Sequence, residues 1–216
     1  MRRPRTSTIV LGTVGSAFVI LIVTMVIGSL RRPDEPTYAP SPARPRDVGD
    51  GPAGPTTYTV DARESDVWVR FDFSRGSIVV ADPTSLDWDI AFSRYRIMTN
   101  GGGTNPAGGA GVVELDPAPL DSTIELPEDG YVSDERSGDE SQNPVLEDWY
   151  SYRWMAHLLE PRDRLYGIRT ADGRYAVLRI LSYYCTGGVS GCVTFRYRYR
   201  GDGERSFPAV TAGTDE

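Results

Sequence analysis

An uncharged and almost wholly apolar run from Ile9 to Leu30 is the feature that most constrains the fold of this chain. As a helix it would span about 33 Å, slightly more than the hydrocarbon core of a bilayer, which is about 30 Å thick. Arginines flank both ends of the run. It therefore predicts a transmembrane anchor over residues 9–30, with residues 1–8 cytoplasmic and the rest of the chain outside the cytoplasm. A cleaved signal peptide is the alternative, although its apolar region is usually shorter and no A-x-A site directly follows this one.

Beyond the apolar run, composition divides the chain into three parts. Residues 31–56 are rich in Pro, Ala, Gly and Asp and have almost no large apolar side chain to bury, so they predict a disordered linker. Residues 57–202 carry the apolar and aromatic side chains of one domain, which suits a chain of 216 residues. Residues 203–216 predict a flexible C-terminal tail.

The charge pattern excludes several function classes. The formal net charge is −7 and the chain contains Arg but no Lys, so no Schiff-base lysine and no phosphate-loop lysine is present. An acidic domain also lacks the basic face that would release counterions from a phosphate backbone. We therefore expect no nucleic-acid partner.

A period of two residues predicts short β-strands through the first half of the domain. Val67, Val69, Phe71 and Phe73 alternate with polar residues and with Trp68 and Arg70, which indicates a half-buried strand. Turn residues then separate this segment from two further apolar segments, residues 77–81 and 88–92. The pattern is typical of a meander of antiparallel strands.

The same alternation is clearest near the C-terminus. Residues 165–170 and 175–184 flank a turn at Ala171-Asp172-Gly173, and a last strand follows Gly187-Gly188. The last strand places Val193, Phe195, Tyr197 and Tyr199 on a core face and three arginines on a face expected to be exposed to solvent. Cys185 and Cys192 flank the final turn, where hairpin geometry predicts a structural disulfide outside the cytoplasm.

Two segments between these strand regions predict loops. The glycine-rich residues 101–111 lack the ending of a phosphate-binding loop and predict a mobile loop, with a pocket rim as an alternative. Residues 121–148 are strongly acidic and predict a solvated loop, with a divalent-cation site as the alternative. A short helix is expected at residues 145–149, with Asn143 as its cap.

Four passages together resemble the HmuY family of haem-binding proteins in order and spacing, over about residues 58–200. They are Leu86–Phe92; Thr99–Gly103 with Gly108–Ala110 behind it; Trp149–Tyr152; and Arg169–Ala176 leading through Ser182–Tyr184 to Val193–Tyr197. The resemblance implies an all-β fold with a minor helix and capture of haem outside the cytoplasm. It also implies that two axial side chains from loops, His or Met, hold the iron. The expected location is the bacterial cell envelope, periplasmic or at the cell surface.

The ligand set cannot be the paired histidines of the best-known family member, because His157 is the only histidine. The other soft ligands outside the apolar run are Met98 and Met155. Met155 and His157 are too close in sequence to approach opposite faces of one porphyrin. His157 with Met98 is therefore the predicted axial pair, and a Tyr ligand stays open.

Two other function classes compete with haem binding. The shortage of histidine favours a non-enzymatic envelope module that keeps the fold and binds a protein partner instead. An enzyme is not expected, because the sequence has neither a G-x-S-x-G elbow nor an H-E-x-x-H motif.

Overall fold

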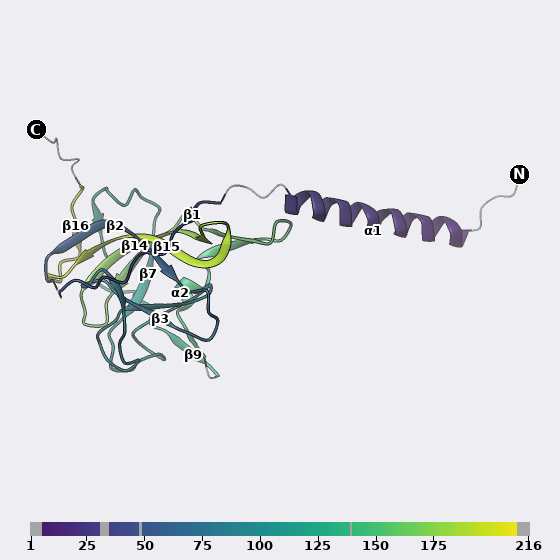
Figure 1. Ribbon diagram of the computed structural model, residues 1–216. Helices are drawn as coiled ribbons and strands as arrows, with labels where there is room; N and C mark the ends of the chain where they lie inside the picture. Colours follow the sequence, from purple (N-terminus) through teal and green to yellow (C-terminus); the bar gives the residue numbers. More distant parts are fainter. Residues whose placement is uncertain (1–5, 31–34, 48, 139, 211–216) are drawn as a thin grey trace, which may run out of the picture. The chain divides into compact units, whose positions relative to one another are not determined.

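The computed structural model of the protein describes residues 6–30, 35–47, 49–138 and 140–210 (Figure 1). Within the first helix, the side chains of residues 14–27 are described. The elements in chain order are α1 (Thr6–Leu30), β1 (Thr37–Tyr38), β2 (Pro52–Asp61), β3 (Val69–Asp72), β4 (Ser77–Val79), β5 (Ile90–Ser93), β6 (Arg96–Thr99), β7 (Gly111–Leu115), β8 (Ile124–Glu125), β9 (Glu135–Ser137), β10 (Glu140–Gln142), α2 (Pro144–Glu147), β11 (Tyr150–Arg153), β12 (Leu158–Pro161), β13 (Leu165–Arg169), β14 (Tyr175–Cys185), β15 (Val189–Arg200) and β16 (Ser206–Phe207).

The chain forms two compact units. One contains α1 together with residues Tyr152–Leu159, and the other contains Pro36–Ser151 and the chain from Glu160 onward. The predicted apolar run lies within α1 and is helical. Across the described residues, no helix has both the length and the hydrophobicity that crossing a membrane requires.

The larger unit is built on two mostly antiparallel sheets. Strands β2, β15, β14, β13 and β7 lie side by side in that order, and β1 adds to β14 in parallel as a sixth strand (Figure 1). The second sheet has four strands in the order β4, β3, β5, β6. The prediction of an all-β fold with a minor helix is confirmed.

Aromatic side chains fill the space between the two sheets. Phe71 of β3 lies with its ring centroid 5.2 Å from that of Phe195 on β15, and Phe92 of β5 stacks on the same ring at 5.4 Å. Phe73 and Tyr197 extend this cluster. Because these rings are buried and come from both sheets, they join the sheets into a sandwich.

The C-terminal hairpin confirms the predicted strands and the disulfide. Cys185 and Cys192 are bonded, with an S–S distance of 2.08 Å, across the turn between β14 and β15. The outer face of β15 differs from the prediction, because Arg198 is buried. Its guanidinium donates to the carbonyl oxygens of Leu120 and Ser122, at 3.1 and 3.0 Å, and also to Pro208. A face of alternating arginines is therefore partly covered by other segments instead of being fully solvated.

The glycine-rich segment is closely packed, and the prediction of a mobile loop is wrong. A Cβ on Gly108 would lie 1.9 Å from the carbonyl oxygen of Asn100, and one on Gly101 would lie 2.2 Å from that of Ala110. The glycines are therefore needed because backbones approach each other there. Asp134 ties the segment down by accepting hydrogen bonds from Thr99 and Thr104, each at 2.6 Å.

The acidic segment is likewise more structured than predicted. Asp134 is buried, and this burial raises its pKa against the hydrogen bonds that lower it. Asn143 also contacts Asp134, and its side chain accepts from the amides of Val145 and Leu146 to cap α2, as predicted. Among the residues with described side chains, no group of three or more His, Cys, Asp or Glu could hold a metal ion.

The domain boundaries differ from those predicted by composition. Within the predicted linker, β1 pairs with β14, β2 begins at Pro52, and the amide of Arg44 donates to Ser77. Within the predicted tail, β16 pairs with β8 and buries Phe207. In the described parts of both segments Phe207 is the only fully buried apolar side chain, so composition does not reveal their strands. Residues 1–5, 31–34, 48, 139 and 211–216 lie outside the described part of the chain.

Candidate functional site

A cleft of about 510 Å³ opens beside the four-stranded sheet. This volume falls within the range of pockets for small organic ligands, about 300–1,000 Å³. Strands β3 and β6 supply Arg70, Arg96 and Met98, the loop before β3 supplies Trp68, and β10 supplies Glu140. Ser65, Asp66, Pro83, Thr104 and Ser141 complete the lining.

Strand register explains why Arg70 and Met98 face the same cleft. Arg70 of β3 pairs with Ala91 of β5, and Ala91 pairs with Met98 of β6. Side chains directly opposite each other on neighbouring strands point to the same face of a sheet. Arg96 lies two residues before Met98 and shares that face by the alternation of a strand. The sheet therefore places a thioether and two guanidinium groups on one face, at the same cleft.

Two arginines that line the cleft each lie over an indole ring. The guanidinium carbon of Arg96 lies 5.3 Å from the ring centroid of Trp68, and that of Arg70 lies 5.5 Å from the ring centroid of Trp88. Trp88 is fully buried, whereas Trp68 is half-buried and lines the cleft. Flat cationic and aromatic surfaces suit a planar ligand with negative charge.

The two arginines differ in how their charge is compensated. Arg96 donates to Glu140 at 2.5 Å and to the carbonyl oxygen of Ser65 at 3.2 Å. Arg70 Nε is buried, and no hydrogen-bond partner for it exists among the described residues. Burial lowers the pKa of Arg70, and the charge of Asp82 partly opposes this shift.

Met98 is nearly buried at 8% exposure and packs against Trp88 and Ala91. The Thr104 hydroxyl oxygen lies 3.9 Å from the Met98 Sδ and 2.6 Å from a carboxylate oxygen of Asp134. Its single proton can be donated to one of the two acceptors at a time. The shorter, charge-assisted bond takes that proton, because bonds to a carboxylate are about twice as strong as neutral ones. The Met98 sulfur, at the lining of the cleft, therefore keeps at most a weak hydrogen bond from Thr104.

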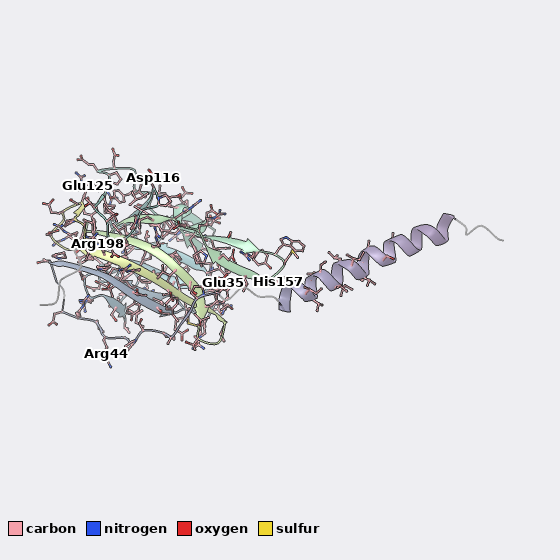
Figure 2. All side chains as sticks on the ribbon, turned by 90° about the horizontal axis from the view of Figure 1, so that it is seen from above. Glu35, Arg44, Asp116, Glu125, His157 and Arg198 are labelled. Carbon is pink, nitrogen blue, oxygen red and sulfur yellow. A yellow bond between two sulfur atoms is a disulfide. The ribbon has the colours of Figure 1, made fainter. Side chains whose placement is uncertain are left out.

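His157 lies in the turn of the β11–β12 hairpin and is exposed (Figure 2). Its φ of 54° is in the left-handed region, where His is enriched over most non-glycine residues. The Nδ1 atom lies 2.7 Å from the hydroxyl of Tyr152, which fixes the ring. Met155 lies in the same turn and is 40% exposed. Because this turn and Met98 belong to different compact units, the predicted pairing of His157 with Met98 stays a prediction.

Other aromatic residues that could have lined a pocket lie in the core. Trp149 is buried, and its Nε1 donates to the carbonyl oxygen of Tyr95 at 2.8 Å. Trp154 instead is 56% exposed on the hairpin turn. The cleft residues Trp68, Arg70, Arg96 and Glu140 were not identified from the sequence. The available signal was the spacing of Trp68 and Arg70, two residues apart on the polar face of the strand predicted from the sequence.

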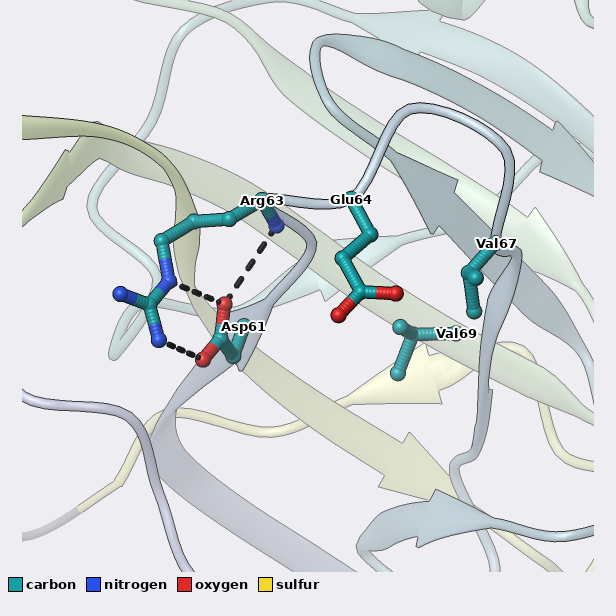
Figure 3. Close-up of a pocket in the computed structure, with 5 residues that line it drawn as sticks. All are labelled: Asp61, Arg63, Glu64, Val67 and Val69. Carbon is teal, nitrogen blue, oxygen red and sulfur yellow. Dashed lines mark hydrogen bonds and ion pairs between the residues drawn. The ribbon is translucent and has the colours of Figure 1, made fainter.

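A second cavity of about 410 Å³ is lined by Asp61, Arg63, Glu64, Val67 and Val69 (Figure 3). Arg63 binds Asp61 at 2.6 and 2.8 Å, and this pairing lowers the pKa of Asp61. Among the described residues, its lining includes no imidazole, thioether or phenol. The first cleft is therefore the better candidate for a ligand held through iron.

The two packed sheets and the cleft define the class of this molecule: an all-β sandwich domain with a surface cleft of ligand size. The sequence profile described as HmuY protein matches residues 64–197. Since this match covers more than half of the chain, the protein belongs to the HmuY family.

Three solved structures show the same fold. An apo HmuY analog from Tannerella forsythia is 18% identical, with a TM-score of 0.55, and the match covers 72% of this chain and 99% of that one. A protein from Bacteroides vulgatus, named provisionally as HmuY-like and heme-binding, is 22% identical (TM-score 0.52; coverage 71% and 94%). A provisionally named lipoprotein from Bacteroides fragilis is 23% identical (TM-score 0.52; coverage 71% and 93%). No curated protein matches the sequence.

Proposed function

We propose that this protein binds haem or a closely related tetrapyrrole in the cleft beside the four-stranded sheet, with Met98 as an axial ligand. The observation that carries the proposal is a thioether that lines a cleft of about 510 Å³ on the same sheet face as Arg70 and Arg96. Met is an established haem ligand, and guanidinium groups pair well with carboxylates. Family membership and the provisional name of the Bacteroides vulgatus relative also support haem as the ligand.

We propose His157 as the second axial ligand. Ligation through Nε2 requires the tautomer in which Nδ1–H donates to the Tyr152 hydroxyl, 2.7 Å away. A hydrogen bond on the second ring nitrogen is usual for a metal-bound histidine, because it fixes the ring and raises its basicity. Met155 in the same turn is the alternative donor.

Titration of the purified full chain with hemin, followed by absorption in the Soret region, tests both assignments. We expect a shifted Soret band for the unmodified protein and a different or weaker band for Met98→Leu, which keeps the side-chain volume but removes sulfur. His157→Ala should change the band if the imidazole ligates iron. Met155→Leu tests the alternative donor and should leave the band unchanged if His157 is the ligand, and Met25→Leu in α1 is the matched control. No shift in the unmodified protein would exclude haem binding, and an unchanged Met98→Leu spectrum would exclude Met98 as ligand.

We propose an extracytoplasmic location in the cell envelope. The Cys185–Cys192 disulfide supports it, because such bonds persist in oxidising compartments, as does the provisionally named lipoprotein among the relatives. The finer proposal that residues 9–30 anchor the protein in a membrane is supported by the uncharged sequence alone. Extraction of a membrane fraction with alkaline carbonate tests it: an anchored chain stays in the pellet, and a peripheral one is released.

A protein-interaction module is the second candidate function. It is favoured by the hairpin turn, where Tyr152, Trp154 and Met155 are all exposed to solvent. Aromatic residues and Met are enriched in the buried centres of protein interfaces. Absence of hemin binding together with a specific partner lost in Trp154→Ser would favour this function.

A further inference from the structure

Arg70 presents an incompletely paired charge to the cleft. Its Nε has no partner among the described residues, and the guanidinium is partly withdrawn from water over the ring of Trp88. Withdrawing a charge from water without a partner destabilises a protein unless an opposite charge is supplied. A ligand anion in the cleft would supply that charge.

Arg96 already forms an ion pair at the same cleft, with Glu140, and a ligand carboxylate could take the place of Glu140. Glu140 accepts the hydrogen bond of Arg96 at 2.5 Å, while the Glu140 side chain is 68% exposed. Glu140 belongs to the β9–β10 hairpin, a two-stranded sheet with largely exposed residues. An ion pair at this exposure contributes little to stability, so separating it requires little free energy.

The positions of the two arginines fit a ligand with two carboxylates. Arg70 and Met98 lie on strands separated by β5, which places their backbones about 10 Å apart at a strand spacing of about 4.8 Å. Arg96 lies on the same strand as Met98, two residues away. A planar molecule centred near the thioether can therefore extend an acidic group toward each guanidinium.

We propose that Arg70 and Arg96 form a dicarboxylate receptor and that Glu140 occupies the place of one ligand carboxylate until the ligand displaces it. The inference rests on the proposed function and names its substrate class: tetrapyrroles with free carboxylates, in preference to esterified or neutral ones. Arg70, whose Nε has no partner among the described residues and whose charge is only partly balanced by Asp82, receives one ligand carboxylate. The second carboxylate replaces Glu140 at Arg96, so that the ion pair lost there is made again with the ligand.

The discriminating experiment uses metal-free protoporphyrin, so that iron ligation does not contribute. The full chain is titrated with protoporphyrin IX and with its dimethyl ester, followed by porphyrin fluorescence. We expect the diacid to bind about ten- to hundredfold more tightly than the ester, because each charge-assisted hydrogen bond contributes substantially. Equal affinity for the diacid and the ester would overturn the inference without any variant.

Two variants, each with a control, test the individual residues. Arg70→Gln should weaken binding of the diacid about tenfold or more and leave the ester unchanged, whereas Arg205→Gln, outside the cleft, should change neither. Glu140→Gln should tighten binding of the diacid by up to about fivefold, because the competing ion pair is lost. Glu135→Gln on the same hairpin is its control. Unchanged affinity in both Arg70→Gln and Glu140→Gln overturns the inference.

The outcome also separates this inference from the proposed function. Binding of hemin with equal affinities for diacid and ester would leave haem binding intact and overturn the dicarboxylate receptor. Failure of both hemin and protoporphyrin to bind would overturn both proposals. Circular dichroism of each variant distinguishes loss of the receptor from loss of the fold, and Arg96→Gln provides a second variant should Arg70→Gln not fold.

Discussion

Asp89 allows a quantitative test of how the two sheets are held together. Its buried carboxyl group accepts hydrogen bonds from the amides of Phe73 and Ala171, at 2.9 and 3.0 Å. Phe73 directly follows β3 in the four-stranded sheet, and Ala171 lies in the turn between β13 and β14 of the six-stranded sheet. One side chain therefore links segments of both sheets.

Replacing Asp89 by Ala leaves two buried amides without an acceptor. Each unpaired group costs about 1–3 kcal/mol, so the free energy of unfolding should fall by about 2–6 kcal/mol. Domains are typically stable by about 5–15 kcal/mol, so the change removes a large part of the total. Asp89→Asn retains one carbonyl oxygen as acceptor and should cost roughly half as much.

The same side chain predicts a pH dependence. Burial, and then the charge of Asp72, raise the pKa of Asp89 from 3.8 to about 8. Between these values the folded protein holds a proton that the unfolded chain has released, so the contribution of Asp89 to stability is largest below about pH 4 and is lost as the pH rises toward 8. The slope from this group is at most about 1.4 kcal/mol per pH unit. Asp89→Asn cannot titrate and should lack this contribution.

Urea unfolding of the purified full chain in mild detergent, followed by tryptophan fluorescence between about pH 4 and pH 8, measures these effects. The stability difference between the unmodified protein and Asp89→Asn should decrease steadily with pH. Asp87→Asn, an exposed neighbour, is the control and should show no such trend. A difference that stays constant across the range would refute the raised pKa, and an unfolding free energy unchanged in Asp89→Ala would refute the link between sheets.

Three further predictions concern local features of the fold, each measured by urea unfolding. Replacing Cys185 and Cys192 by Ser opens a loop with a sequence separation of 7 and should cost about 2.5 kcal/mol; reducing agent should have the same effect on the unmodified protein only. Gly108→Ala should cost about 1–3 kcal/mol, because its Cβ would overlap the Asn100 carbonyl, whereas Gly173→Ala has open space and tests the backbone effect alone. Asn143→Ala removes the cap of α2 and should cost about 1–2 kcal/mol; no change would show that the cap is dispensable.

The strands of the domain could be predicted from the sequence because their burial alternates. Val193, Phe195 and Tyr197 recur with a period of two and lie in the core, and the cysteines at the ends of the final turn are bonded. The cap at Asn143 was also predictable, because capping depends on a residue type at one position. These features are local, so neighbouring residues are sufficient to indicate them.

Features that depend on distant segments were not predictable. Arg198 looked solvated because alternation does not reveal that residues 120–122 and 208 cover it. Glycines 101–108 looked mobile because close approach of two backbones leaves no pattern of side chains. The cleft was missed for the same reason: Arg70 and Arg96 come together only when β5 lies between their strands. Met98 was identified as a ligand candidate by its chemistry alone.

The short strand β1 also determines where mechanical load would enter the domain. Thr37 and Tyr38 pair with Tyr184 and Cys185, and the amide of Thr186 donates to the Tyr38 carbonyl at 3.1 Å. Tension on the chain before residue 36 would reach this parallel contact first. From there it would pass into the hairpin that the disulfide crosslinks, where a covalent bond limits extension. A pull on this end of the domain should therefore separate the two-residue pairing of β1 from β14 before it loads the strands that line the cleft.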